Sequence, residues 1–351
     1  MTVADATTAP HALPDADQRR RQRLLAVLTG LAAVGVLAGL MTGAQGFSPS
    51  AFLGDLQSDD AALILGQIRA PRTLGAALVG ALLGLGGAIA QGLFRNPLAD
   101  PYLLGSAAGA GLAVVLVLAA AALGGTYLSL ASVAWLERVG LVAAAFVGAL
   151  GGVALTLTLA RGAVQTLRLL LAGVVVAVLL GALSDLVTVI APEALRGKQA
   201  FLLGSTSFLG WAALALMAAG LAGLMPVARV HARALDALTL GEDSAASLGL
   251  NLARVRLALI GLLSLSTALA VSQSGLIAFV GLVAPHLVRR HAPGAHAWLL
   301  GASAAMGAVL LLVADVVARA VIAPQELPVG VVSAVLGGVY LFVLLRRGVR
   351  P

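Results

Sequence analysis

The feature that most constrains this chain is a series of apolar runs, most of them about 20 residues long, with very few charges. An α-helix needs about 20 apolar residues to cross the hydrocarbon core of a bilayer. In lipid the backbone must satisfy its own hydrogen bonds, which a helix does within a single segment. The pattern therefore predicts an all-α polytopic membrane protein with about ten transmembrane helices. The apolar runs cover residues 24–44, 63–93, 102–122, 139–160, 168–190, 211–227, 257–274, 276–290, 298–320 and 328–345.

Composition excludes a water-soluble domain. Hydrophobic residues make up 60% of the 351 residues and charged residues 11%, whereas soluble domains carry about 25% charged residues. The 42 glycines suit helices that pack closely in a bilayer, as in the Gly80-xxx-Gly84 and Gly105-xxx-Gly109 spacings. The chain has no cysteine, which excludes disulfides, thiolate metal sites and cysteine nucleophiles.

The positive charge is explained by membrane topology. A net charge of +7 would suggest a nucleic-acid partner in a soluble protein, but the arginines here cluster between apolar runs, so no nucleic acid is expected and the surroundings are membrane lipid. If both termini are cytoplasmic, most basic residues lie on the cytoplasmic side of the membrane. Counting the runs 257–274 and 276–290 as one span would instead place Arg289 and Arg290 on the outer side. The expected organisation is a disordered cytoplasmic tail (1–23), a transmembrane domain (24–345) and a short cytoplasmic tail (346–351).

The polar stretch at about 238–250 has a regular layout. Gly241 precedes a short helical pattern that begins with Glu242, which is favourable at a helix N-terminus. Gly249 can end that helix, and Ala245 contributes a small-residue surface that another protein could approach closely. The residues alone leave two interpretations open, a docking element and a simple connector.

Five stretches together resemble one known family. Residues 238–250 are similar to the coupling segment of the iron-siderophore and cobalamin family of ABC importer permeases. The other stretches match the same family in its order and spacing, and the resemblance extends from about residue 24 to near the end of the chain. They are 67–74 (QIRAPRTL), 95–101 (RNPLADP) with 104–105 (LG), 279–286 (FVGLVAPH) and 326–331 (ELPVGV).

The resemblance implies a division of labour between chains. Two permeases, as a homodimer or a paralogous heterodimer, form a pathway at their interface, and two separate ATPase subunits dock beneath them. The chain lacks a G-x-x-x-x-G-K-[ST] phosphate loop, so ATP and magnesium are expected only on the ATPase, and this chain is expected to bind no cofactor. The residues implied in ATPase coupling are Leu240, Gly241, Glu242, Ala245 and Gly249.

On the outer side, the resemblance implies an extracytoplasmic substrate-binding protein that presents carboxylates to Arg69, Arg72 and Arg319. Arginine suits this role because its planar guanidinium binds a carboxylate with two donors. The alternative is that these arginines snorkel or pair within the chain, since Asp315 lies four residues before Arg319. Other residues of the family motifs are expected to be structural or to line the pathway: Arg95, Asn96, Pro97, Asp100, Gly105, Pro285, His286, Glu326, Pro328 and Gly330.

Two acids within apolar runs, Asp185 and Asp315, suggest an alternative function as an ion-coupled secondary transporter. Satisfaction of both carboxylates by neighbouring polar groups is the favoured interpretation. His286, His291 and His296 are spaced by five residues and so cannot share one helical face, and no metal site is expected. No catalytic constellation is recognisable, so an enzyme is not expected.

The resulting expectation is the permease subunit of an ATP-driven importer in the cytoplasmic (inner) membrane of a prokaryote. A ferric siderophore is the expected cargo, because the family that the chain resembles handles these most often. Cobalamin and haem are the alternatives.

Overall fold

The computed structural model describes residues 16–346 except 44, 57–59, 61, 125–129 and 163–164. The described elements are helical apart from two two-residue strands that pair in an antiparallel hairpin, so the all-α prediction is confirmed. In chain order they are α1 (Ala16–Met41), β1 (Thr42–Gly43), β2 (Gly46–Phe47), α2 (Pro49–Leu56), the π-helix η1 (Ala62–Arg69), α3 (Ala70–Phe94), α4 (Ser106–Gly124), α5 (Leu130–Leu159), α6 (Thr166–Ile190), α7 (Ala194–Leu203), α8 (Trp211–Val230), α9 (Ala232–Thr239), α10 (Glu242–Ser247), α11 (Leu252–Ser274), α12 (Val280–His291), α13 (His296–Ala320) and α14 (Val329–Arg346).

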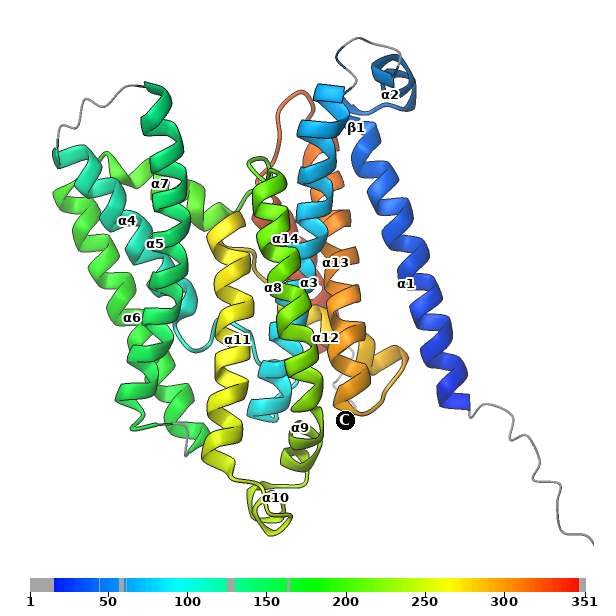
Figure 1. Cartoon of the computed structure of the whole chain (residues 1–351), viewed down its shortest axis with the longest axis vertical. Coiled ribbons are helices and arrows are strands. Elements are labelled where there is room, and N and C mark those ends of the chain that lie inside the picture. Colours follow the sequence, from blue (N-terminus) through cyan, green and yellow to red (C-terminus); the bar gives the residue numbers. More distant parts are fainter. Residues whose placement is uncertain are drawn as a thin grey trace, which may run out of the picture.

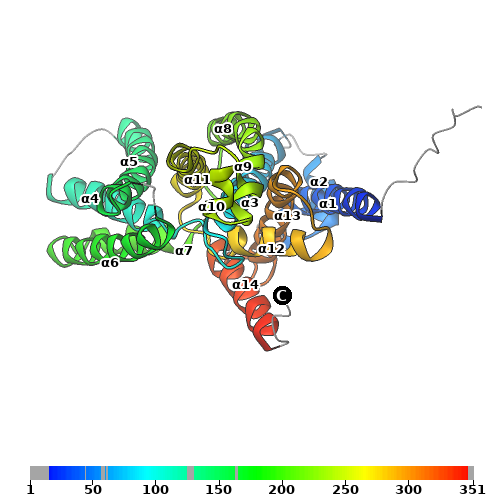
Figure 2. The ribbon, with the colours of Figure 1, turned by 90° about the horizontal axis from the view of Figure 1, so that it is seen from below.

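The helices form a central group flanked on both sides. Figures 1 and 2 show α3, α8, α11 and α13 in the middle, with α4, α5 and α6 on one side and α1 on the other. Helix α3 is buried along nearly its whole length and contacts α13, α11 and α12. Figure 1 places α10 at the lower end, where α1 begins, and α2 at the upper end. These are called the coupling end and the opposite end below.

One of the ten predicted spans is clearly shorter than expected. Eight described helices are long and apolar enough to cross a membrane. The predicted span 328–345 forms the 18-residue helix α14, as long as predicted, whereas the segment 276–290 contains only the 12-residue helix α12. At 1.5 Å per residue, α12 is about 18 Å long, less than the hydrocarbon thickness of about 30 Å. The shortening arises because α11 ends at Gly275 (φ 69°) and Phe279 also has a positive φ of 67°.

Part of the segment predicted to be a disordered tail is helical. Residues 1–15 lie outside the described residues, and residues 16–23 form the first two turns of α1. These turns contain alanine, glutamine and arginine, which favour helices. Asp17 lies in the first turn, 3.9 Å from the guanidinium of Arg20. Of the predicted tail 346–351, Arg346 ends α14 and the other residues lie outside the described part.

Glycines bring the central helices into backbone contact. A Cβ atom added to Gly84 of α3 would collide with the carbonyl oxygen of Ser303 in α13, and one added to Gly80 would collide with that of Gly307. Gly109 of α4 and Gly148 of α5 are in similarly close contact: a Cβ atom added to either one would collide with the carbonyl oxygen of the other. The glycine spacings predicted from the sequence therefore mark real helix contacts.

We expect Gly84→Ala to destabilise the protein. Its methyl group has no space at the α3–α13 contact, and overpacking costs about 1–3 kcal/mol. Thermal unfolding in detergent measures the change as a lower Tm. The control is Gly151→Ala in α5, where an added Cβ meets no atom within 4 Å; alanine favours the helix there, so its Tm should match or exceed the wild type. Equal Tm values for the two variants would contradict the assigned contact.

Candidate functional site

The predicted coupling segment forms a compact helical unit at the coupling end (Figure 1). Helix α9 is followed by the six-residue helix α10, which two glycines flank. Gly241 has φ 108° and Gly249 has φ 84°, backbone conformations that glycine adopts without steric cost. The predicted order of glycine, short helix and glycine is thus present.

The unit presents apolar side chains outwards. Ala245 of α10 is fully buried, whereas Leu240 and Leu248, on either side of the helix, are 67% and 66% exposed. Both leucines are therefore accessible to another protein at this end of the molecule.

Glu242 joins this unit to three transmembrane helices. Its Oε1 atom forms an ion pair with Arg256 Nη2 at 2.5 Å. The same atom accepts hydrogen bonds from Thr166 Oγ1 at 3.2 Å and Arg95 Nη2 at 3.4 Å. Arg95 follows the end of α3, Thr166 begins α6 and Arg256 lies in the first turns of α11. These four residues are called the Glu242 cluster.

The buried member of the Glu242 cluster was missed by sequence reasoning. The Arg256 side chain is only 2% exposed, and a buried guanidinium needs a counter-ion. The available signal was an arginine placed at the start of a long apolar run, with an acid in the preceding loop. Thr166 carried no such signal, because hydroxyls are common in membrane helices.

The loop after α3 holds the motif at 95–101 in a fixed shape. Arg95 ends the helix with φ 50°, and the side-chain Oδ1 of Asn96 accepts a hydrogen bond from the amide of Leu98 at 2.9 Å. Pro97 is exposed within this turn. The turn thereby directs the Arg95 side chain toward Glu242.

The second half of the same loop is anchored to the core. Asp100 Oδ1 accepts the amide hydrogen of Tyr102 at 2.8 Å, and the Tyr102 hydroxyl donates to the Ile277 carbonyl at 3.2 Å. Burial raises the pKa of Asp100 to about 6, and the amide hydrogen bond partly offsets this effect. Gly105, with φ 81°, completes the turn before α4. These contacts hold the loop against the core, and α4 begins four residues later than the predicted span at 102.

The predicted outer arginines lie at the opposite end, around Asp315. The carboxylate of Asp315 is fully buried and accepts hydrogen bonds from Thr206 Oγ1 at 2.5 Å, Arg72 Nε at 3.4 Å and Arg319 Nη2 at 2.5 Å. Arg72 also donates through Nη1 to Glu326 Oε1 at 2.9 Å. These five residues are called the Asp315 cluster.

The three arginines differ in exposure. Arg319 is 2% exposed and also donates to the carbonyls of Gly39 and Thr42 at 2.9 and 3.0 Å. The Arg72 side chain is 11% exposed and its partner Glu326 is 35% exposed. Arg69 donates to the Leu40 carbonyl at 3.0 Å. In this conformation Arg72 and Arg319 pair within the chain, which was the alternative to docking.

Comparison with known protein families shows which family the chain belongs to. The model of the FecCD transport family matches residues 31–347. The chain belongs to the FecCD transport family. The resemblance identified from the five stretches is therefore confirmed, and this FecCD protein is the permease subunit of an ABC importer and a multi-pass protein of the bacterial inner membrane.

Individual relatives align over most of their lengths. The FecCD chain is 40% identical over 282 residues to the hemin transport system permease protein HmuU of Yersinia pestis, covering 80% of this chain and 82% of HmuU. It is 38% identical over 333 residues to the vitamin B12 import system permease protein BtuC of Salmonella paratyphi A, covering 94% and 97%.

Solved structures show the same fold. A metal-chelate type ABC transporter in an inward-facing conformation superimposes with a TM-score of 0.79 at 28% identity, covering 93% of this chain and 99% of that one. PsaBC from Streptococcus pneumoniae shares the fold, with a TM-score of 0.56 at 15% identity.

The remaining family motifs of the FecCD permease pack around α12 and α14. Pro285 is buried in α12, and the His286 ring lies 5.9 Å from that of Tyr340 in an edge-on arrangement. Pro328 precedes α14, and a Cβ added to Gly330 would collide with the Leu203 carbonyl oxygen. Among the described residues there is no group of three potential metal ligands. The contacts of Pro285, His286 and Gly330 are packing contacts of α12 and α14.

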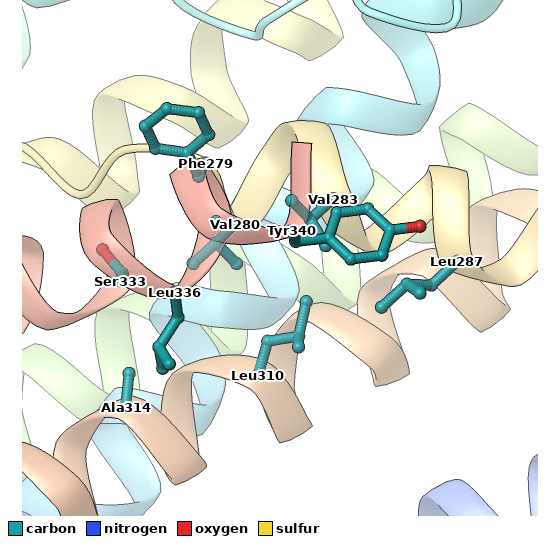
Figure 3. Close-up of a pocket in the computed structure, with 10 residues that line it drawn as sticks. Phe279, Val280, Val283, Leu287, Leu310, Ala314, Ser333, Leu336 and Tyr340 are labelled. Atoms are coloured by element: carbon teal, nitrogen blue, oxygen red, sulfur yellow. The ribbon is translucent and has the colours of Figure 1, made fainter. Parts of the chain in front are cut away.

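An apolar cavity of about 130 Å³ lies between α12, α13 and α14. Figure 3 shows Phe279, Leu310, Leu336 and Tyr340 around it. The Tyr340 hydroxyl has no hydrogen-bond partner among the described residues. Such a lining can accommodate apolar groups, and none of the predicted coupling or docking residues contributes to it.

Proposed function

We propose that this FecCD permease imports a metal chelate of the tetrapyrrole type, driven by two ATPase subunits that dock on α10. The observation that supports the coupling role is the Glu242 cluster. One carboxylate oxygen links α10 to the end of α3, the start of α6 and the start of α11. A displacement of α10 is thereby passed directly to three transmembrane helices, without any bond chemistry in this chain.

The proposed assembly contains two copies of the permease or two related permeases. The pathway lies at their interface, and ATP and magnesium are used by the ATPase subunits. The exposed Leu240 and Leu248 would be covered by the ATPase. Gly241 and Gly249 allow the backbone to turn sharply on each side of the helix.

The proposed cargo class follows from the relatives. One relative transports hemin and another imports vitamin B12, and both cargoes hold a metal within a macrocycle. The ferric siderophore expected from the sequence is not supported by these two relatives.

A substrate-binding protein is proposed to dock at the opposite end. Arg72 and Glu326 are the partly exposed members of the Asp315 cluster, so an incoming carboxylate would exchange with Glu326 at Arg72. Arg69 would add a second contact. Arg319 would support the site from beneath, because it is buried against Asp315 and the end of α1.

Uptake of radiolabelled hemin and cobalamin tests the cargo. In cells whose other importers of these compounds have been deleted, loss of this gene should reduce uptake of one of them at least tenfold, and the wild-type gene should restore it. A ferric siderophore serves as the third substrate. Loss of siderophore uptake alone would overturn the tetrapyrrole proposal while leaving the importer assignment intact.

A further inference from the structure

A polar pocket lies beside the Glu242 cluster, and neither the coupling nor the docking proposal accounts for it. Its volume is about 310 Å³, and it opens at the coupling end, where Figure 2 shows α9, α12 and α13 around the end of α3. It is called the α3–α12 pocket. Its lining includes Gln91, Arg95, Asn96, Thr239, Arg289 and His296.

The central group is the half-buried Arg289 in the last turn of α12. Its Nη1 donates to the side-chain oxygen of Gln91, and the Gln91 amide nitrogen donates in turn to the Leu282 carbonyl at 3.0 Å. Gln91 is thereby fixed and uncharged. Among the described residues, Arg289 forms no ion pair with a carboxylate. A partly buried cation without a counter-ion is costly.

Two acids near the pocket, Asp236 and Glu242, are engaged by other groups. Asp236 Oδ1 accepts hydrogen bonds from the backbone amide and the Nδ1 of His296, at 2.9 and 2.6 Å. Glu242 is bound by Arg95 and by the buried Arg256. The pocket is consequently lined by two guanidiniums, two amide side chains and a hydroxyl, with no free carboxylate in the described lining.

A pocket lined by these hydrogen-bond donors and positive charges favours an oxyanion such as phosphate as its ligand. Guanidinium groups bind phosphate with two parallel hydrogen bonds, and these charge-assisted bonds are stronger than neutral ones. The last turn of α12 also carries Arg290 and His291, as expected where lipid headgroups meet the protein. Basic pockets between helices on the cytoplasmic side of membrane proteins bind anionic headgroups.

We propose that the α3–α12 pocket binds a phosphate group, with Arg289 as its main ligand and Arg95 and Asn96 at its rim. The phosphate belongs either to an anionic phospholipid or to free inorganic phosphate. Binding needs neither the ATPase nor cargo, so this proposal can fail while the proposed function holds.

Two measurements on the purified permease distinguish a phospholipid headgroup from free inorganic phosphate as the ligand. Native mass spectrometry after reconstitution with phosphatidylglycerol detects a retained lipid, and equilibrium dialysis with radiolabelled inorganic phosphate detects a free anion. Arg289→Gln should weaken binding of one probe at least tenfold. Arg290→Gln, the exposed neighbour on the same helix, should retain wild-type binding.

Arg289→Lys provides a second variant if the glutamine variant does not fold. Lysine keeps the charge but lacks the paired donors, so binding should fall by a smaller factor. If the Arg289 variant loses lipid retention, the ligand is a phospholipid headgroup. If it loses binding of inorganic phosphate, the ligand is the free anion. Wild-type binding of both probes by Arg289→Gln, or by Arg289→Lys if the glutamine variant does not fold, would overturn the proposal. Binding of neither probe by the wild type would overturn it as well.

Discussion

Glu242→Ala should reduce ATP-driven cargo uptake at least tenfold while the permease remains inserted in the membrane. The substitution leaves Arg256, 2% exposed, without its carboxylate and disconnects α10 from Arg95 and Thr166. Removing one partner of a buried ion pair costs about 3–5 kcal/mol. Because Glu242 is itself 35% exposed, the lower end of that range applies. Proteoliposomes containing the partner ATPase allow uptake and ATP hydrolysis to be measured together.

The matched control is Asp243→Ala. Asp243 is exposed on the same short helix, so its removal changes the charge of α10 equally but leaves the Glu242 cluster intact. We expect near-normal uptake. In the Glu242 variant, hydrolysis should continue without proportional uptake, since the ATPase would still move α10. Equal uptake by the two variants would show that the Glu242 cluster does not transmit the motion.

Asp315→Ala should have the largest effect on stability. It removes the acceptor of Arg319, Arg72 and Thr206 at once and leaves Arg319 buried without a counter-ion. A cost of about 3–5 kcal/mol is expected for such a loss. The fraction of monodisperse protein in size-exclusion chromatography, together with Tm in detergent, reports the change.

Asp185→Ala distinguishes this structural role from ion coupling. The Asp185 side chain is 75% exposed and pairs with Lys198 at 2.5 Å; an exposed pair contributes about 0–1 kcal/mol. We expect little change in Tm or uptake for this variant. A folded Asp185 or Asp315 variant whose uptake no longer depends on the proton gradient would instead favour the ion-coupled alternative.

The sequence was sufficient for the class of fold and for the short helix between Gly241 and Gly249. Long apolar runs specify membrane helices because lipid leaves the backbone no other way to satisfy its hydrogen bonds. The glycines at 241 and 249 mark the ends of α10 because few other residues adopt those backbone angles. Both signals are local, so they can be read without knowing the tertiary contacts.

Which charged side chains pair with one another could not be predicted from local sequence signals. Arg256, Thr166 and Arg95 lie far apart in the chain. They meet at Glu242 only because the end of α3 and the starts of α6 and α11 lie together. The same holds for Arg72 and Arg319: their chemistry suits docking and internal pairing equally, and only burial against Asp315 shows how they are engaged here. The sequence thus determined which segments are helices in lipid, because that depends on local polarity. The tertiary structure alone decided which charges neutralise one another, because that depends on which helix ends lie side by side.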